Sequence, residues 1–210
     1  MKQALCISGL LLVLAAGCTT TPPTIGDPPP QLTDRRAEQA YQDAFASFSD
    51  RAEIYDGFDT RLFAGATFQT VAFREARVQR VAQFQFLPKT RVEELLAKER
   101  AEEAQFHEFF LGVHVNDYRF DDFDQKDSIW RVVMLTPSVE VEPLSIQRIG
   151  RADLNMRTMY PYMGVFWVAY SVRFPKVLPN GAPVIPESAS HVQLRLASTL
   201  GHAELRVHAR

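Results

Sequence analysis

The sequence has very little cysteine. Its 210 residues contain two, Cys6 and Cys18, and both lie near the N-terminus. From Thr19 onward the chain therefore has no cysteine pair that could form a disulfide and no thiolate nucleophile. This excludes a disulfide-stabilised domain and cysteine-based catalysis for everything that follows Cys18.

Sequence motifs of catalysis and zinc binding are missing as well. The chain has no Gly-x-Ser-x-Gly nucleophile turn, no phosphate-binding glycine loop and no dinucleotide fingerprint. Its histidines lack the spacing of a zinc site such as His-Glu-x-x-His; they are His107, His114, His191, His202 and His208. We therefore expect a protein that is not an enzyme and has no catalytic residues. A periplasmic hydrolase built from dispersed carboxylates or histidines stays open as a second alternative.

Neither sign of charge dominates. The chain has 23 Lys and Arg against 25 Asp and Glu, a formal net charge of -2. Without a basic stripe, a nucleic-acid partner is not expected. The one local basic cluster is Arg74, Arg77 and Arg80, whose spacing places them on one face of a helix. We expect a solvated helix face there, with a partner or headgroup contact as the alternative.

The N-terminus lacks a hydrophobic run long enough to cross a membrane permanently. The apolar segment from Ala4 to Ala16 is shorter than the roughly 20 residues that a spanning helix needs. After the basic Lys2 it has the pattern of a secretory signal peptide, and it ends in Leu14-Ala15-Ala16-Gly17-Cys18. An ordinary secretory signal with an incidental cysteine is one interpretation of this ending.

With its small residues before a cysteine, the same ending resembles the lipobox of bacterial lipoproteins. The resemblance implies cleavage between Gly17 and Cys18, a diacylglycerol on the Cys18 sulfur and an acyl chain on the new N-terminus, with no other cofactor. Two or three acyl chains anchor a protein stably to a membrane. In such lipoproteins of enteric bacteria, an aspartate directly after the lipidated cysteine is a signal for retention in the inner membrane. This chain has Thr19 there, so the resemblance further implies the periplasmic face of the outer membrane.

A proline-rich segment follows Cys18. Residues 19–34 read TTTPPTIGDPPPQLTD and contain five prolines, a composition that extends as a stiff spacer and builds no packed core. We therefore divide the chain into a signal peptide (1–17), a lipidated cysteine with its tether (18–34) and one globular domain (35–210).

The first part of that domain, about 35–106, is expected to be mainly helical. Residues 34–48 suit a helix that buries Ala40, Phe45 and Phe48. Two short strands, AEIYDGF and RLFAGATF, should follow around Gly57 and Asp59. A second helix is expected from Thr70 to Phe86, with its apolar side formed by Val71, Val78, Val81 and Ala82.

A third helix is expected over about 91–105. Its start is marked by a capping box from Thr90 to Glu93, in which each residue would satisfy the other's backbone amide. Val92, Leu95 and Leu96 would pack. The second half, KERAEEA, is charged on all sides, so we expect it to project into solvent or to bridge to a neighbouring element.

The second part, about 107–210, alternates apolar and polar residues with a period of two, as strands do. Alternating runs begin at Phe109, Trp130, Phe166 and Val192, and Pro143 should mark a bulge or a switch between sheets. The segment LPNGAP (178–183) is a turn sequence, and the last two strands should form a hairpin with His202 and His208 facing solvent. The fold class is therefore α+β: an antiparallel β-sandwich, with an immunoglobulin-like arrangement as one option, preceded by two or three helices.

The acidic stretch DYRFDDFDQKD (117–127) is the first candidate site. Read as an EF-hand loop from Asp117, it lacks glycine at the sixth position and glutamate at the twelfth. A calcium site of another kind, using Asp121, Asp122 and Asp124, remains an alternative. The pattern favours a solvated loop between two strands with its aromatic residues against the sandwich edge.

Aromatic residues form the second candidate site. Tyr160, Tyr162, Phe166, Trp167 and Trp130 could line a ligand groove, since aromatics carry binding energy at recognition surfaces. Trp167 lies one residue out of step with the alternating run from Phe166, so its side chain should point to the other face of the strand, outward or into the helical layer. We favour coverage by the helices over an exposed partner site.

Together these features predict a non-catalytic interaction or scaffold module, lipid-anchored in the envelope, with an envelope protein as its partner. The first alternative is a lipoprotein that binds a small ligand or metal ion through residues 117–127.

Overall fold

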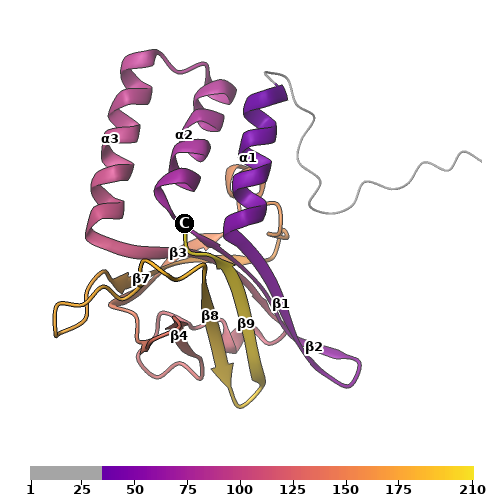
Figure 1. Cartoon of the computed structure of the whole chain (residues 1–210). Coiled ribbons are helices and arrows are strands. Elements are labelled where there is room, and N and C mark those ends of the chain that lie inside the picture. Colours follow the sequence, from indigo (N-terminus) through magenta and orange to yellow (C-terminus); the bar gives the residue numbers. More distant parts are fainter. Residues whose placement is uncertain (1–34) are drawn as a thin grey trace, which may run out of the picture.

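The computed structural model describes residues 35–210, which form an α+β fold containing a β-sandwich (Figure 1). Three helices, α1 (Arg35–Phe48), α2 (Val71–Gln85) and α3 (Lys89–Gln105), stand side by side with α2 in the middle. The predicted signal peptide, Cys18 and the tether lie outside the described residues.

Two antiparallel sheets make the sandwich. The five-stranded sheet has the order β1 (Ser49–Asp56), β2 (Asp59–Phe68), β3 (Phe106–Val115), β7 (Val168–Pro175) and β6 (Ser145–Arg151). The four-stranded sheet has the order β5 (Glu140–Val141), β4 (Arg131–Leu135), β8 (His191–Ser198) and β9 (Gly201–His208). Consecutive strands β1, β2 and β3 are neighbours in one sheet, whereas the second and third strands of an immunoglobulin domain lie in different sheets.

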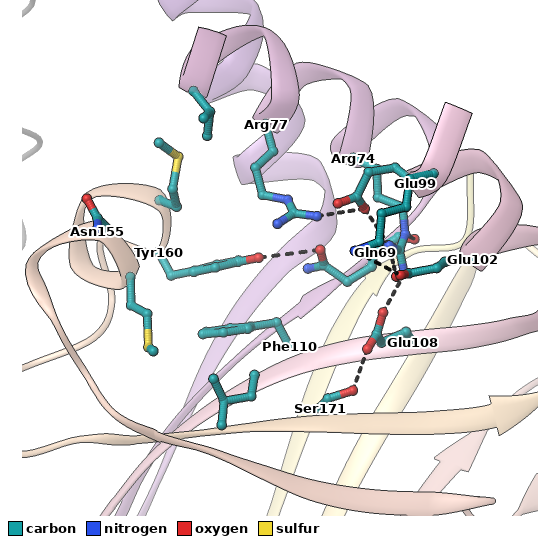
Figure 2. Close-up of a pocket in the computed structure, with 15 residues that line it drawn as sticks. Gln69, Arg74, Arg77, Glu99, Glu102, Glu108, Phe110, Asn155, Tyr160 and Ser171 are labelled. Atoms are coloured by element: carbon teal, nitrogen blue, oxygen red, sulfur yellow. Dashed lines mark hydrogen bonds and ion pairs between the residues drawn. The ribbon is translucent and has the colours of Figure 1, made fainter. Parts of the chain in front are cut away.

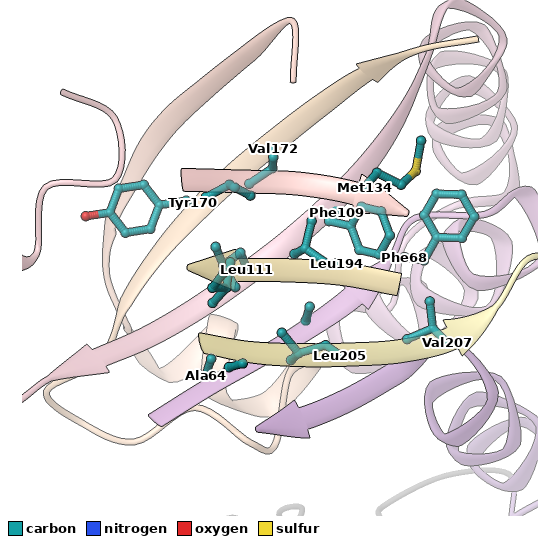
Figure 3. Packing of buried hydrophobic residues seen from close by; sticks show 14 of the residues in the cluster. Ala64, Phe68, Phe109, Leu111, Met134, Tyr170, Val172, Leu194, Leu205 and Val207 are labelled. Carbon is teal, nitrogen blue, oxygen red and sulfur yellow. The ribbon is translucent and has the colours of Figure 1, made fainter. Parts of the chain in front are cut away.

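The main core lies between the two sheets, where alternate residues of each strand point inward. Phe109, Leu111 and Val113 of β3 are fully buried against Leu194 and Leu205 of the opposite sheet (Figure 3). Burying one such side chain contributes about 1.5–3 kcal/mol to folding. The predicted alternation is thereby confirmed for this strand and for Val168, Tyr170, Val172 and Phe174 of β7.

A second core joins the outer face of the five-stranded sheet to the helices. Phe110 of β3 and Ala169 of β7 point away from the sandwich and pack with Tyr41, Phe48 and Phe73 from the helical layer. Strand β3 is consequently covered on both faces, which explains why its sequence FHEFFLGVHV is apolar beyond simple alternation.

The predicted strand switch at Pro143 is confirmed. Val141 ends β5 in the four-stranded sheet, and β6 begins two residues after Pro143 in the five-stranded sheet. Pairing resumes when the backbone N–H of Leu144 donates to the carbonyl of Arg173 at 2.7 Å. Proline, which has no N–H to donate, stands where the chain leaves one ladder for the other.

Helix α1 has the predicted bounds but a different buried face. Phe48 is buried as expected, whereas Ala40 is exposed, so that prediction was wrong. Tyr41 is fully buried in its place, because positions 38, 41, 45 and 48 follow the helical repeat toward the sheet.

Helix α2 begins at a side-chain cap. The Thr70 hydroxyl accepts a hydrogen bond from the backbone N–H of Phe73 at 3.2 Å. Val71 was expected on the apolar side but is exposed, and Phe73 is buried instead.

The predicted capping box at the start of α3 was wrong. The helix begins at Lys89 after Pro88, whose extended backbone forms the N-cap without a side-chain hydrogen bond. Thr90 thus lies inside the first turn. The expectation that the charged second half bridges to a neighbour is confirmed, since Glu99 pairs with arginines of α2 and Glu103 with Lys176.

A fourth helix, α4 (Leu154–Met159), was not predicted. Asp153 caps it by accepting from the backbone N–H of Met156 at 2.7 Å. The chain then passes through residues 160–167 before β7 begins at Val168. Phe166 therefore lies outside the strand and is 77% exposed, contrary to the predicted alternating run from Phe166.

The turn and the terminal hairpin match their predictions. Gly181 has a φ of +82°, and Leu178 donates to the carbonyl of Ala182 at 2.8 Å to close the turn. Strands β8 and β9 pair over their whole length. Within residues 35–210, none of the helices has both the length and the apolar character needed to cross a bilayer.

Candidate functional site

Two glycines position the segment between α4 and β7. Gly65 of β2 and Gly112 of β3 are cross-strand partners, and both face the helical side of the sheet. A Cβ at Gly65 would lie 2.4 Å from the ring of Tyr162, and one at Gly112 would lie 3.1 Å from it. The missing side chains allow the Tyr162 ring to rest directly on the backbone of the sheet.

A groove of about 500 Å³, here called the aromatic groove, lies beside Tyr162, between the segment that joins α4 to β7 and the sheet. Its floor is formed by side chains on the outer face of β2 and β3. Phe63 stacks on His114 with ring centroids 6.3 Å apart and on Trp167 at 6.4 Å. The lining residues are Arg51, Ala52, Glu53, Phe63, Ala64, His114, Tyr162, Gly164, Val165, Phe166 and Trp167.

The rim of the aromatic groove presents apolar side chains to solvent. Phe166 is 77% exposed and Val165 is 55% exposed. Arg51 and Glu53 contribute one charge of each sign. Trp167 is half-buried and packs against Tyr162, so the helical side of the molecule covers it in part while it also lines the groove.

Three residues of the predicted aromatic set lie in the hydrophobic cores. Tyr160 and Tyr162 are buried in the second core, and Trp130 is buried in the first. Of the proposed ligand-groove set, the structure brings Tyr162, Phe166 and Trp167 together at one surface and leaves Trp130 and Tyr160 elsewhere.

A second pocket, of about 380 Å³, lies between α2, α3 and the sheet and is here called the charged pocket. Arg74 lies on one side of it, next to Glu99, Glu102 and Gln69 (Figure 2). Its guanidinium bonds Glu99 of α3 at 2.5 Å, Glu108 of β3, and the backbone carbonyl of Gln69 at 2.9 Å. Arg77 bonds the same oxygen of Glu99 at 2.7 Å. The carboxylates therefore hold both helices to the sheet.

Two titratable groups of the charged pocket, Glu108 and Tyr160, have pKa values shifted away from neutral pH. Burial raises the pKa of Glu108, but the hydrogen bond from Ser171 and the charge and hydrogen bond of Arg74 outweigh it and hold that pKa below its usual range. Burial raises the pKa of the Tyr160 hydroxyl above its usual value, against the charge of Arg77. Glu108 is therefore a carboxylate and Tyr160 a neutral phenol, and a general acid or base near pH 7 would need the opposite shifts.

The expected solvated face of arginines was wrong for Arg74 and Arg80, each only 2% exposed. Arg80 donates to both carboxylate oxygens of Glu38 at 2.9 Å and to the carbonyl of Thr158 at 2.5 Å, and it lies 4.2 Å from the Tyr41 ring centroid. Arg77 remains partly accessible at the charged pocket. A partner could not reach Arg74 or Arg80.

The acidic stretch lies between β3 and β4, and Asp121 and Asp122 bond protein groups. Asp121 pairs with Arg148 at 3.0 Å and accepts from the Tyr170 hydroxyl at 2.7 Å, and Asp122 accepts from Ser128 at 2.9 Å. One oxygen of Asp124, Oδ1, is buried without a hydrogen-bond partner. In the described part of the chain, no three His, Cys, Asp or Glu side chains are grouped to hold a metal ion.

The aromatic residues of this loop pack as expected. Phe123 is buried and stacks on Trp130 with ring centroids 5.0 Å apart, and the Trp130 indole donates to the carbonyl of Phe120 at 2.7 Å. Tyr118 instead points to solvent. The loop closes one end of the sandwich.

The sequence matches no protein-family model and no curated protein, and the fold matches no solved structure.

Proposed function

We propose that this chain is a lipid-anchored envelope protein whose folded domain is a non-catalytic interaction module. Acyl chains on Cys18 would hold it at the periplasmic face of the outer membrane. Residues 19–34 would space the domain from the bilayer. Support for the anchor comes from the lipobox-like ending of the N-terminal apolar run and the proline-rich segment behind it.

The aromatic groove is the proposed contact surface, and the exposure of Phe166 is the observation that carries this proposal. Removing large apolar side chains from water is favourable, so a partner that covers them gains binding free energy. Aromatic residues in a pocket are the usual centres of binding energy at protein interfaces. Phe166, Val165 and Trp167 offer such a centre, with Arg51 and Glu53 at its polar rim.

The rim also indicates what kind of partner would fit. Arg51 and Glu53 carry opposite charges, so the groove has no net attraction for a phosphate or for a strongly acidic or basic segment. We infer a protein partner that places apolar side chains in the groove against Phe63 and Trp167. The alternative of a ligand bound through residues 117–127 has less support, because Asp121 and Asp122 are engaged with Arg148, Tyr170 and Ser128.

Site-specific photo-crosslinking in cells tests the proposal. A photoreactive phenylalanine analogue at Phe166 should give a discrete crosslinked protein band. The matched control is the analogue at Phe86, an 86% exposed phenylalanine at the far end of α2. Bands of equal intensity at both positions, or none at Phe166, would contradict the proposed contact surface.

A further inference from the structure

Two histidines face each other across the terminal hairpin. His191 of β8 is the cross-strand partner of His208 of β9, and their ring centroids are 4.4 Å apart. The backbone hydrogen bond beside the pair joins the flanking residues, from the N–H of Ala209 to the carbonyl of Ser190 at 3.0 Å. His191 and His208 therefore occupy a position of the ladder that is called a non-hydrogen-bonded pair. In antiparallel sheets that is the kind of pair whose side chains come closest together.

The pair is accessible and partly oriented. Val192 and Val207 point into the core, so His191 and His208 lie on the opposite, solvent face of the sheet. The Nδ1 atom of His191 lies 2.9 Å from the Ser190 hydroxyl. When Nδ1–H donates to this hydroxyl, Nε2 carries the lone pair for a ligand, the arrangement found where a metal-binding imidazole is held through its other nitrogen.

We propose that His191 and His208 form a two-histidine site for a divalent transition-metal ion of the zinc or copper type. Imidazole nitrogens suit these ions, and zinc–nitrogen bonds are about 2.0–2.1 Å long. Two rings already in contact need only side-chain rotation to bring both nitrogens onto one ion. Water fills the remaining coordination positions, since no third His, Cys, Asp or Glu of residues 35–210 joins the group.

Arg206 limits the strength of the site. It lies two residues before His208 on the same face, and Gln193 is its cross-strand partner. Burial, and then the charges of Arg206 and His208, lower the pKa of His191. The positive charge of Arg206 also repels a dication, so its removal should strengthen binding.

Calorimetric titration of the untagged full-length chain in mild detergent with zinc chloride at pH 7.5 tests this site. We expect saturable binding that weakens at least ~10-fold in His191→Asn and in His208→Asn. His202→Asn is the matched control, because His202 lies on the same face of β9 but opposite Ala197, and should bind as the wild type does. Arg206→Gln should bind several-fold more tightly.

A second readout keeps the test valid if a variant folds poorly. In the wild-type chain, the imidazole carbon–proton resonances of His191 and His208 should shift together on zinc addition, before those of the other three histidines. Absence of binding at millimolar zinc would overturn the proposal. So would equal losses of affinity in His202→Asn and His208→Asn.

Discussion

Buried charge is the main feature at the scale of single residues. Arg80 and Glu38 form a two-bond ion pair under Tyr41, with both oxygens of Glu38 engaged by one guanidinium. Such a pair adds little to folding stability compared with an apolar pair of the same size. Removing one partner, however, leaves a buried charge without compensation and destabilises the fold.

Arg80→Met should therefore lower the free energy of unfolding by about 3–5 kcal/mol. Arg91→Met, which breaks the exposed pair with Glu94, should cost at most about 1 kcal/mol. Urea denaturation measures both. If the buried charge is the cause, Glu38→Met combined with Arg80→Met recovers most of the loss; a double variant as unstable as Arg80→Met would refute this explanation.

His107 gives the domain a predictable response to acid. Burial, and then the charge of Lys176, lower the pKa of His107 from 6.5 to about 3. Between these values the unfolded chain binds a proton that the folded chain does not. The stability conferred by the neutral imidazole is complete above pH 6.5 and is lost as the pH falls toward 3.

His107→Gln should accordingly flatten the decline in stability between pH 6.5 and pH 4.5, by up to about 1.4 kcal/mol per pH unit. Denaturation curves at several pH values give the slope directly, and His202→Gln on the exposed face of β9 serves as the control. Parallel pH profiles for His107→Gln and the wild type would show that the imidazole is not responsible.

The sequence identified Arg74, Arg77 and Arg80 as one stripe of a helix but not the side to which the stripe points. Their spacing is local information. Their partners Glu99 and Glu38 lie 25 and 42 residues away, on helices whose packing the helical period does not define. Arginine stripes are usually solvated, so the outcome depended on which carboxylates the fold brings opposite.

At the scale of secondary-structure elements, the best-predicted parts are those in which apolar residues recur regularly over a long stretch. The bounds of α1, the alternation in β3 and the terminal hairpin all follow from periodicity and turn residues. Helix α4 was missed because its six residues are less than two turns. The capping box failed because the helix begins at Lys89, one residue before Thr90, with Pro88 as its N-cap.

The contact between Gly65 and Tyr162 positions the whole segment beside the aromatic groove. Gly65→Ala would place a Cβ 2.4 Å from the Tyr162 ring, so the ring must move. We expect a loss of about 1–3 kcal/mol in the free energy of unfolding, as in other overpacked sites.

Introducing Gly65→Ala into a Tyr162→Ala background provides the control, because the clash then has no second partner. The cost of the glycine substitution should largely disappear there, which a double-mutant cycle of denaturation free energies measures. An equal cost in both backgrounds would place the effect in the strand backbone instead.

Helix α3 has no fully buried residues, and its second half forms ion pairs with Arg74 and Arg77 of α2 and with Lys176. Glu99→Gln removes the ion pairs with Arg74 and Arg77, so local opening of α3 should cost less free energy. Amide hydrogen exchange should therefore be faster throughout α3. Glu94→Gln, in an exposed pair with Arg91, is the matched variant and should leave exchange unchanged. Equal protection in the two variants would contradict this account of α3.

At the scale of the whole molecule, the aromatic groove lies beside the junction of the two hydrophobic cores. The sandwich core and the helical layer share β3, and the segment 160–167 that rims the aromatic groove rests on their junction. The α+β class was predictable from the order of periodic segments. The groove was not, because it requires Gly65, Gly112 and a distant loop to meet in space.

The proposed membrane anchor would place this domain in the envelope, where the proposed partner at the aromatic groove would meet it. Cys18 is the single residue on which the proposed anchor depends, since it is the one cysteine that would remain after the proposed cleavage between Gly17 and Cys18. An unlipidated chain would be released into the periplasm.

Metabolic labelling with palmitate, comparing the wild type with Cys18→Ala, tests this central claim most directly. The account predicts labelled protein in the membrane fraction for the wild type and no label for Cys18→Ala, with the variant's domain still folded. Equal labelling of the two chains, or an unlabelled wild type, would contradict it.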